Sequence, residues 1–391
     1  MRKIWPFTFN FFWFACGACV VPFFVLFYQE LGFTGTQIGL LTGITPLITS
    51  FSAPFWTGLA DAKRRHRLIM NLALLIGAIS IVIFPLLKAF LLILIIVIVL
   101  NFFLAPVQPF ADSATMFMLA DEKEMYGRIR LGGTIGYGLA ASIAGMVVEN
   151  YGLRLAFLGS ACLMLLAFII SQKLVYGQKE AGDPVEGSVR TLLMDPRWLL
   201  FLTVAFVGGL TMAATNNYFF PYMKELGVTE STMGLALMIG TAVEIPVLFW
   251  GNRFLKLFKS YRLFMLAMVL TGVRFLLFAV SGTPNAVLFV QLLNGLNFPI
   301  MWVAGVSYAN ENAPAGMSTT ALGLFTAMVF GFGNAVGGFM GGLLLERIGG
   351  SGIFLVYGVI VFIVLAVVTL LSRRLTAKRK KLPDASDGLT G

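Results

Sequence analysis

The sequence predicts an all-α membrane protein with twelve transmembrane helices arranged as two pseudo-symmetric six-helix bundles. Three observations predict this fold: an apolar composition, twelve long apolar segments and an internal repeat. Hydrophobic residues make up 58% of the 391 residues and charged residues 12%, against about half and about a quarter in soluble domains. No soluble fold could bury that much apolar surface, so we expect the lipid bilayer to surround the chain.

Each of the twelve apolar segments reaches the ~20 residues that a helix needs to cross the hydrocarbon core. The segments run near 5–28, 38–60, 68–87, 90–118, 129–149, 153–174, 197–221, 233–251, 262–281, 285–308, 318–344 and 352–372. The longest polar interruption falls in the middle of the chain and is expected to be a linker. The predicted domains are an N-terminal bundle at 1–175, a cytoplasmic linker at 176–196, a C-terminal bundle at 197–375 and a disordered cytoplasmic tail at 376–391.

An internal repeat indicates that the two bundles are built alike. One set of residues returns after 195 positions: Glu30, Leu31, Gly32, Thr34, Gly39 and Leu40 match Glu225, Leu226, Gly227, Thr229, Gly234 and Leu235. A second set returns after 197 positions: Gly136, Gly145, Glu149 and Gly152 match Gly333, Gly342, Glu346 and Gly349. Membrane proteins with such repeats place their substrate site between the two like halves.

The basic charge follows a membrane topology rather than a site for a polyanion. The formal net charge is +10, and 23 of the 28 Lys and Arg residues fall at the termini or in alternate connections. Cytoplasmic connections carry such an excess. We therefore expect both termini in the cytoplasm, no nucleic-acid partner, and a multi-pass protein of the plasma membrane, such as the cytoplasmic membrane of a prokaryote. The three Cys residues lie in apolar segments and indicate neither disulfides nor a metal site.

The connection after the second apolar segment carries a family motif. Its sequence, FWTGLADAKRRHR from Phe55, resembles the Gly, Leu, Ala, Asp and basic pattern between helices 2 and 3 of the major facilitator superfamily. The resemblance implies a conformational latch formed by Asp61, Lys63, Arg64 and Arg65. Thr57 stands where the family has its first Gly, so the match is incomplete. A plain positive-inside connection also accounts for the basic residues.

Ionisable residues inside apolar segments are costly and therefore indicate function. Asp112 with Arg130 forms one candidate pair, and Glu244 with Arg274 forms another. Structural ion pairs that hold helices together are the alternative for both. Arg130 could also lie at a helix end and reach the interface.

The segment Gly127–Arg130 resembles the entry to helix 5 of the lactose permease and phenylpropionate permease groups. Asp112 lies fifteen positions before Gly127, as the helix 4 carboxylate does in lactose permease. The resemblance implies that Asp112 and Arg130 bind substrate, and that Arg274 supports proton coupling.

Amide residues extend both candidate sites, and the alternative for each is a hydrogen bond that ties helices together. Gln108 lies one helical turn before Asp112, so the two side chains share a face. Asn294 and Asn297 occupy neighbouring turns of another segment and are further candidates for substrate binding. They stand where the permease has a His and a Glu. Since an Asn cannot titrate, proton coupling must run through Glu244, Asp112 or another group, or be absent; Glu244 is the expected carrier.

These observations predict a secondary active transporter that moves a small organic solute by alternating access, with proton symport. We expect a monomer without a cofactor or metal. An exporter of amphipathic compounds or lipids and an uncoupled facilitator are alternatives that share the fold. A membrane-embedded enzyme would need a nucleophile, a base or metal ligands at depth, and the single His, at position 66, lies in a connection.

Overall fold

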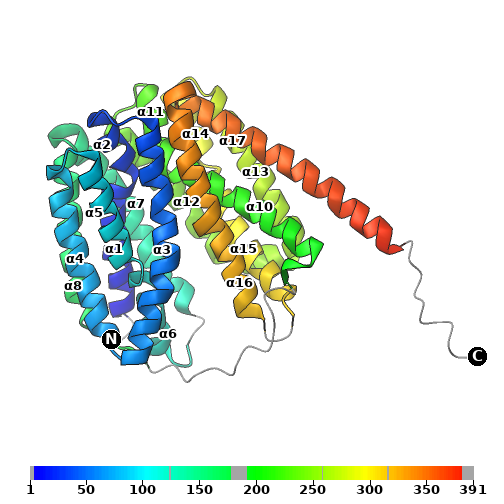
Figure 1. Ribbon diagram of the computed structural model, residues 1–391, viewed down its shortest axis with the longest axis horizontal. Coiled ribbons are helices and arrows are strands. Elements are labelled where there is room, and N and C mark those ends of the chain that lie inside the picture. The colour runs from blue at the N-terminus through cyan, green and yellow to red at the C-terminus, as the bar shows by residue number, and fades with distance from the viewer. Residues whose placement is uncertain (1–3, 123–124, 178–191, 258, 315–316, 381–391) are drawn as a thin grey trace, which may run out of the picture.

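Every regular element in the described part of the chain is a helix (Figure 1). The computed structural model describes residues 4–122, 125–177, 192–257, 259–314 and 317–380. The N-terminal helices are α1 (Ile4–Val20), α2 (Phe24–Glu30), α3 (Gly35–Lys63), α4 (His66–Ile83), α5 (Phe90–Leu104), α6 (Val107–Leu119), α7 (Tyr126–Tyr151) and α8 (Leu153–Ser171). The C-terminal helices are α10 (Pro196–Ala213), α11 (Phe219–Glu225), α12 (Glu230–Leu257), α13 (Ser260–Val280), α14 (Pro284–Gln291), α15 (Asn294–Glu311), α16 (Ser318–Thr326) and α17 (Asn334–Lys380).

Several helices continue each other through short irregular turns. A 3₁₀ turn, η1 (Val21–Phe23), joins α1 to α2, and another, η2 (Phe84–Leu86), follows α4. Two π-helical turns, η4 (Ala214–Tyr218) and η5 (Ala327–Gly333), join α10 to α11 and α16 to α17. Such turns shift the register of a helix without ending it.

Ten stretches in the described ranges are long and apolar enough to cross a membrane, which confirms the all-α membrane fold. The last of them, Ser318–Leu375, holds the segments predicted at 318–344 and 352–372. They meet at Gly349, whose φ of 68° and ψ of −176° break the helical path inside α17. The helix α12 is not among the ten, so the count of twelve spans and the side on which the termini lie stay predictions.

The repeated ELG segment forms the same turn twice. Gly32 and Gly227 have positive φ values of 74° and 71°, which glycine adopts without steric cost. Thr34 then caps α3 by accepting a hydrogen bond from the Gln37 N–H at 3.3 Å, and the Gln37 side chain accepts from Thr34 N at 3.0 Å. This capping box starts α3 at a defined residue.

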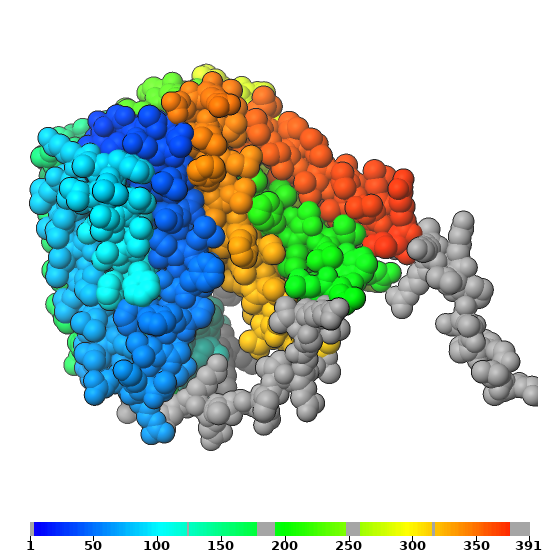
Figure 2. Space-filling model, viewed as in Figure 1, coloured from blue at the N-terminus to red at the C-terminus, as the bar shows by residue number. Residues whose placement is uncertain are grey.

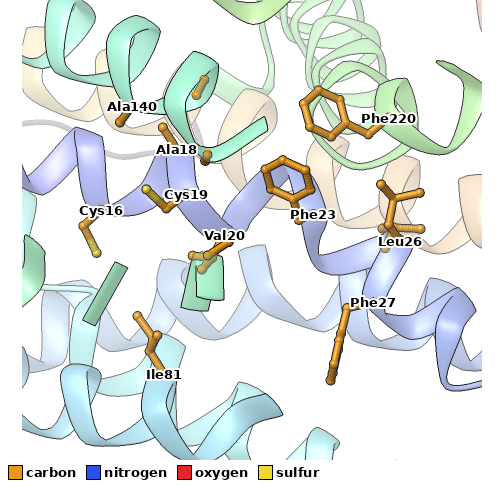
Figure 3. Close-up of a cluster of buried hydrophobic side chains, with 14 of the residues drawn as sticks. Cys16, Ala18, Cys19, Val20, Phe23, Leu26, Phe27, Ile81, Ala140 and Phe220 are labelled. Carbon is orange, nitrogen blue, oxygen red and sulfur yellow. The ribbon is translucent and has the colours of Figure 1, made fainter. Parts of the chain in front are cut away.

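The N-terminal and C-terminal helices touch most closely at one end of the molecule, which we call the distal end. It carries the turns between α2 and α3, between α7 and α8 and between α11 and α12, and Gly349 in α17. There α3 packs on α17 and α7 packs on α12, and Figure 2 shows the surfaces of α3 and α17 in contact. The rings of Phe23 and Phe220 meet edge to face at 4.9 Å (Figure 3).

The opposite end, near the N-terminus, is arranged differently. In Figure 1 the helices α3 and α6 diverge from α15 and α16 toward this N-terminal end. Residues 178–191, which hold most of the predicted linker, lie outside the described residues. The predicted tail begins at 376, whereas α17 continues to Lys380; residues 381–391 also lie outside the described part. The predicted domain boundaries stay predictions.

Candidate functional site

Asp112 on α6 and Arg130 on α7 lie side by side, as the spacing of the motif predicts. Arg130 Nη1 donates to Asp112 Oδ1 at 3.3 Å, and the Gln108 amide donates to the same oxygen at 2.7 Å. The Asp112 side chain is 33% exposed and the Arg130 side chain 39%. Because an ion pair at this exposure is only weakly stabilising, both groups keep the capacity to bind a solute.

A helix break sets the position of the carboxylate. Pro106 has no N–H, so α5 ends at Leu104 and α6 begins at Val107. Pro109 lies in the first turn of α6, where a missing N–H has no intrahelical partner to lose. Gln108 and Asp112 then stand at i and i+4 on one face of α6, which explains their hydrogen bond.

Two aromatic residues that the sequence did not single out complete this site. The Phe14 ring lies under the Arg130 guanidinium, 4.9 Å from its centroid, and the Tyr126 hydroxyl interacts with Asp112. A Cβ at Gly133 would lie 2.6 Å from the Phe14 ring, so this glycine lets α1 approach α7. Tyr126 stands four residues before Arg130, a usable signal, whereas Phe14 is one of 37 Phe residues and carries none.

The direct ion pair expected between Glu244 on α12 and Arg274 on α13 is not formed among the described residues. Glu244 Oε1 accepts a hydrogen bond from Asn294 Nδ2 at 2.9 Å, and Arg274 Nη2 donates to Gln291 Oε1 at 2.8 Å. The two charges still interact electrostatically. The expected ion pair is therefore corrected to two separate contacts, in which α15 supplies an amide to Glu244 and α14 supplies an amide to Arg274.

The Arg274 part of this arrangement is deeply buried and leaves polar atoms unsatisfied within the protein, whereas Glu244 and Asn294 are only partly buried. Arg274 is 2% exposed, Gln291 1% and Asn297 3%. Within the described chain, both amide atoms of Asn297, Gln291 Nε2 and Arg274 Nε have no hydrogen-bond partner. Buried polar groups are nearly always paired with protein, water or ligand. Both amide atoms of Asn297 are therefore available for further hydrogen bonds, whereas Asn294 already donates to Glu244.

The helices α7 and α12 connect the two sites. Tyr137 lies on α7, which packs on α12, the helix that carries Glu244. Tyr137 follows Arg130 by seven residues, about two turns, on the same helix. A Cβ at Gly138 would overlap the Thr241 hydroxyl, so this glycine sets the close approach of the two helices. A shift of α7 against α12 would therefore move Arg130 relative to Glu244.

The predicted latch residues lie at the N-terminal end, where Asp61 bonds within its own connection. Its Oδ1 lies 2.7 Å from His66 Nε2, and among the described residues no ion pair joins Asp61 to Lys63, Arg64 or Arg65. The His66 ring stacks on Tyr176 at 5.7 Å between centroids. His66 is thus a hydrogen-bond partner of Asp61. In the equivalent connection, Phe249–Arg262, the side chains of 249–258 lie outside the described residues.

Comparisons with known proteins agree with this architecture. The sequence matches the model of the MFS_1 like family over residues 5–356. It is 25% identical to the maltose permease of Geobacillus stearothermophilus over 374 residues, 95% of each chain. It is 23% identical to the uncharacterized transporter YwbF of Bacillus subtilis (strain 168), over 87% of this chain and 86% of YwbF. The crystal structure of the nucleoside transporter NupG has a TM-score of 0.83 at 16% identity, covering 94% of this chain and 98% of NupG, and shows a shared fold.

The family resemblance and the multi-pass membrane location inferred from the sequence are thereby confirmed. The related proteins are transporters and not enzymes, and they carry small molecules across a lipid bilayer. The chain belongs to the MFS_1 like family of major facilitator membrane transporters.

Proposed function

We propose that this transporter takes up a hydroxyl-rich solute of the sugar class in symport with protons, by alternating access. The observation that carries the proposal is the hydrogen-bonded cluster of Asp112, Arg130 and Gln108, in which the two charged side chains are 33% and 39% exposed. A carboxylate accepts hydrogen bonds from hydroxyls while a guanidinium and an amide donate to them. The maltose permease, a relative over nearly the full length, supports the same substrate class.

Arg130 is well placed to bind such a solute. Its guanidinium has five N–H donors, of which one goes to Asp112 while the Phe14 ring supports the planar face. The remaining donors can reach two vicinal hydroxyls. Asn297, whose amide has no partner within the protein, adds a donor and an acceptor from the C-terminal helices. A solute that bonds to both groups of helices would favour the state in which they close around it.

Glu244 is the proposed proton carrier. Its partner is the neutral Asn294 amide, which can donate to a carboxylate and can also accept from a protonated carboxyl group. Both protonation states of Glu244 therefore keep a hydrogen bond. Arg274 is held by Gln291 and by the Phe278 ring, 5.0 Å away, as well as by its electrostatic interaction with Glu244. Such a group can bind and release a proton without loss of its surroundings.

The contacts at the distal end support one conformational state of the proposed transport cycle. The two groups of helices meet there and diverge at the N-terminal end (Figure 1). With the predicted cytoplasmic termini, the structure corresponds to an inward-facing state. Opening of the distal end would then admit solute from outside.

Thermal unfolding of the purified protein with a panel of sugars, nucleosides and aromatic acids would identify the substrate class. We expect sugars to raise Tm, because a ligand that binds only the folded state stabilises it. The Asp112→Asn variant is the matched control and should lose that rise. A panel in which only aromatic acids or amphipathic compounds raise Tm would contradict the sugar proposal.

Liposomes with an imposed pH gradient test the coupling and the direction of transport. An acidic exterior should drive accumulation of the labelled solute above equilibrium, and a protonophore should abolish the accumulation. Equilibration without accumulation would instead support an uncoupled facilitator, the function favoured by Asn294 and Asn297 at titratable positions of the permease pattern. Extrusion driven by the opposite gradient would support an exporter.

A further inference from the structure

Two crossings between the groups of helices close the distal end, and each carries a carboxylate on a helix N-terminus. At the first crossing, Glu346 Oε2 on α17 accepts a hydrogen bond from Gly35 N, the first residue of α3, at 2.8 Å. At the second crossing, Glu149 Oε2 on α7 accepts from Ser231 N, in the first turn of α12, at 3.0 Å. Both hydrogen bonds join a helix of the N-terminal group to a helix of the C-terminal group.

Glycines bring each carboxylate within reach of its partner. A Cβ at Gly342 would overlap the Gly39 backbone, so α17 and α3 cross in direct backbone contact. A Cβ at Gly145 would overlap the Glu230 carbonyl, and α7 and α12 cross in the same way. Larger residues at these positions would separate the helices and break the two hydrogen bonds.

The internal repeat encodes both crossings. Glu149 and Gly145 are the repeat partners of Glu346 and Gly342, 197 positions apart. The capped helices α3 and α12 each follow one copy of the ELG turn. The arrangement is therefore reciprocal, since the C-terminal helices supply one carboxylate and the N-terminal helices supply the other.

A helix N-terminus favours such a contact. Its first N–H groups have no intrahelical acceptor, and the aligned peptide dipoles place a partial positive charge there. A carboxylate from another helix satisfies one N–H and neutralises part of that charge. Each carboxylate and the helix that it caps belong to different groups of helices. The hydrogen bond therefore exists only while the distal end is closed.

We propose that Glu149 and Glu346 form a pair of carboxylate caps that holds the distal end closed and sets the balance between the closed and open states. This inference rests on the proposed alternating access. It concerns residues remote from the substrate and proton sites, and it is independent of the Asp61 connection at the other end. A contact made in one state alone shifts the equilibrium by its own free energy. Each cap should change the ratio of open to closed molecules about two- to fivefold.

The chain contains a matched control for this proposal. Glu225 Oε2 accepts from Gly350 N at 2.7 Å and so caps the second arm of α17. The chemistry and the distal location are the same, but both residues belong to the C-terminal helices. Loss of this cap should lower stability without opening the distal end.

Spin-label distance measurements on the full-length protein in nanodiscs would test the caps. Labels at Lys88→Cys, exposed in the connection before α5, and at Asn285→Cys, exposed in the first turn of α14, report opening after replacement of Cys16, Cys19 and Cys162 by Ala. We expect Glu149→Ala with Glu346→Ala to raise the ratio of the long to the short distance about tenfold, the product of the two single effects. Glu225→Ala should leave the ratio unchanged.

Equal distance distributions in the parent and the double variant would overturn the proposal, as would opening of the same size in Glu225→Ala. The isosteric Glu149→Gln and Glu346→Gln variants keep the crossings packed and should show a smaller shift in the same direction if the alanine variants fail to fold. Because the distances are measured without substrate, failure of the caps is distinguishable from failure of the proposed transport, which uptake assays measure.

Discussion

The polar site of the N-terminal helices and that of the C-terminal helices each contain a carboxylate and an arginine, but they hold these groups differently. Asp112 and Arg130 pair directly and are about a third exposed, whereas Glu244 and Arg274 are each held by an amide and Arg274 is 2% exposed. A half-exposed pair can exchange its bonds with a solute at small cost. A partly buried carboxylate that is held by an amide can instead change its protonation without losing its partner. The difference supports a division between substrate binding and proton coupling.

The largest effect is expected from removal of charge at the exposed pair. Asp112→Asn and Arg130→Gln should each lower kcat/KM for uptake about a hundredfold, because a hydrogen bond to a charged group contributes up to about 3 kcal/mol. Asp121→Asn, an exposed carboxylate just after α6, should leave uptake unchanged. Initial rates of uptake into liposomes measure these effects. Near-normal uptake by both site variants would show that the Asp112 and Arg130 pair has only a structural role.

The next effect separates coupling from binding. Glu244→Gln keeps a hydrogen bond to Asn294 but cannot carry a proton. We expect accumulation driven by a pH gradient to fall about tenfold or more, while exchange of labelled for unlabelled solute stays within about twofold. Glu311→Gln, at the end of α15 next to Ser260, is the control. If Glu244→Gln accumulates solute normally, another group carries the proton.

Substitution of one glutamine at each site compares how much the two sites contribute to stability. Gln291→Leu leaves the buried Arg274 without its acceptor and should lower the free energy of unfolding by about 2–3 kcal/mol. Gln108→Leu leaves Asp112 with Arg130, the Tyr126 hydroxyl and solvent, and should lower the free energy of unfolding by about 1 kcal/mol. Thermal unfolding of both variants in one detergent measures the order. Equal losses of stability in the two variants would contradict the difference in burial between the two glutamines.

The smallest effect is expected at the aromatic supports. Phe14→Leu removes the ring beside Arg130 and should raise KM about threefold, since a cation–π contact at this exposure contributes about 0.5–1 kcal/mol. Phe278→Leu removes the ring beside Arg274 and should lower Tm without changing KM. Kinetics and unfolding of both variants, measured in parallel, sharpen the division between a binding site and a buried coupling site. A larger change of KM in Phe278→Leu would reverse it.

Much of the first site was predictable because its signals are local. Spacing in a helix places Gln108 and Asp112 on one face, and the motif at Gly127 identified Arg130 by resemblance. The bond between Glu244 and Asn294 was not predictable, because it depends on how α12 meets α15. Phe14 belongs to an apolar helix in which every position resembles the next.

The sequence by itself determined the membrane location, the helical segments and the doubled architecture, since apolar length, charge distribution and repeat spacing are properties of the chain read in order. It also placed Glu149 and Glu346 at matching positions of the repeat. Only the tertiary structure decided what those carboxylates touch. Glu346 meets Gly35, 311 residues away in the chain, and such a contact depends on the packing of one group of helices against the other. Packing of this kind follows from the shapes of whole surfaces and from the conformational state, and no local pattern encodes it.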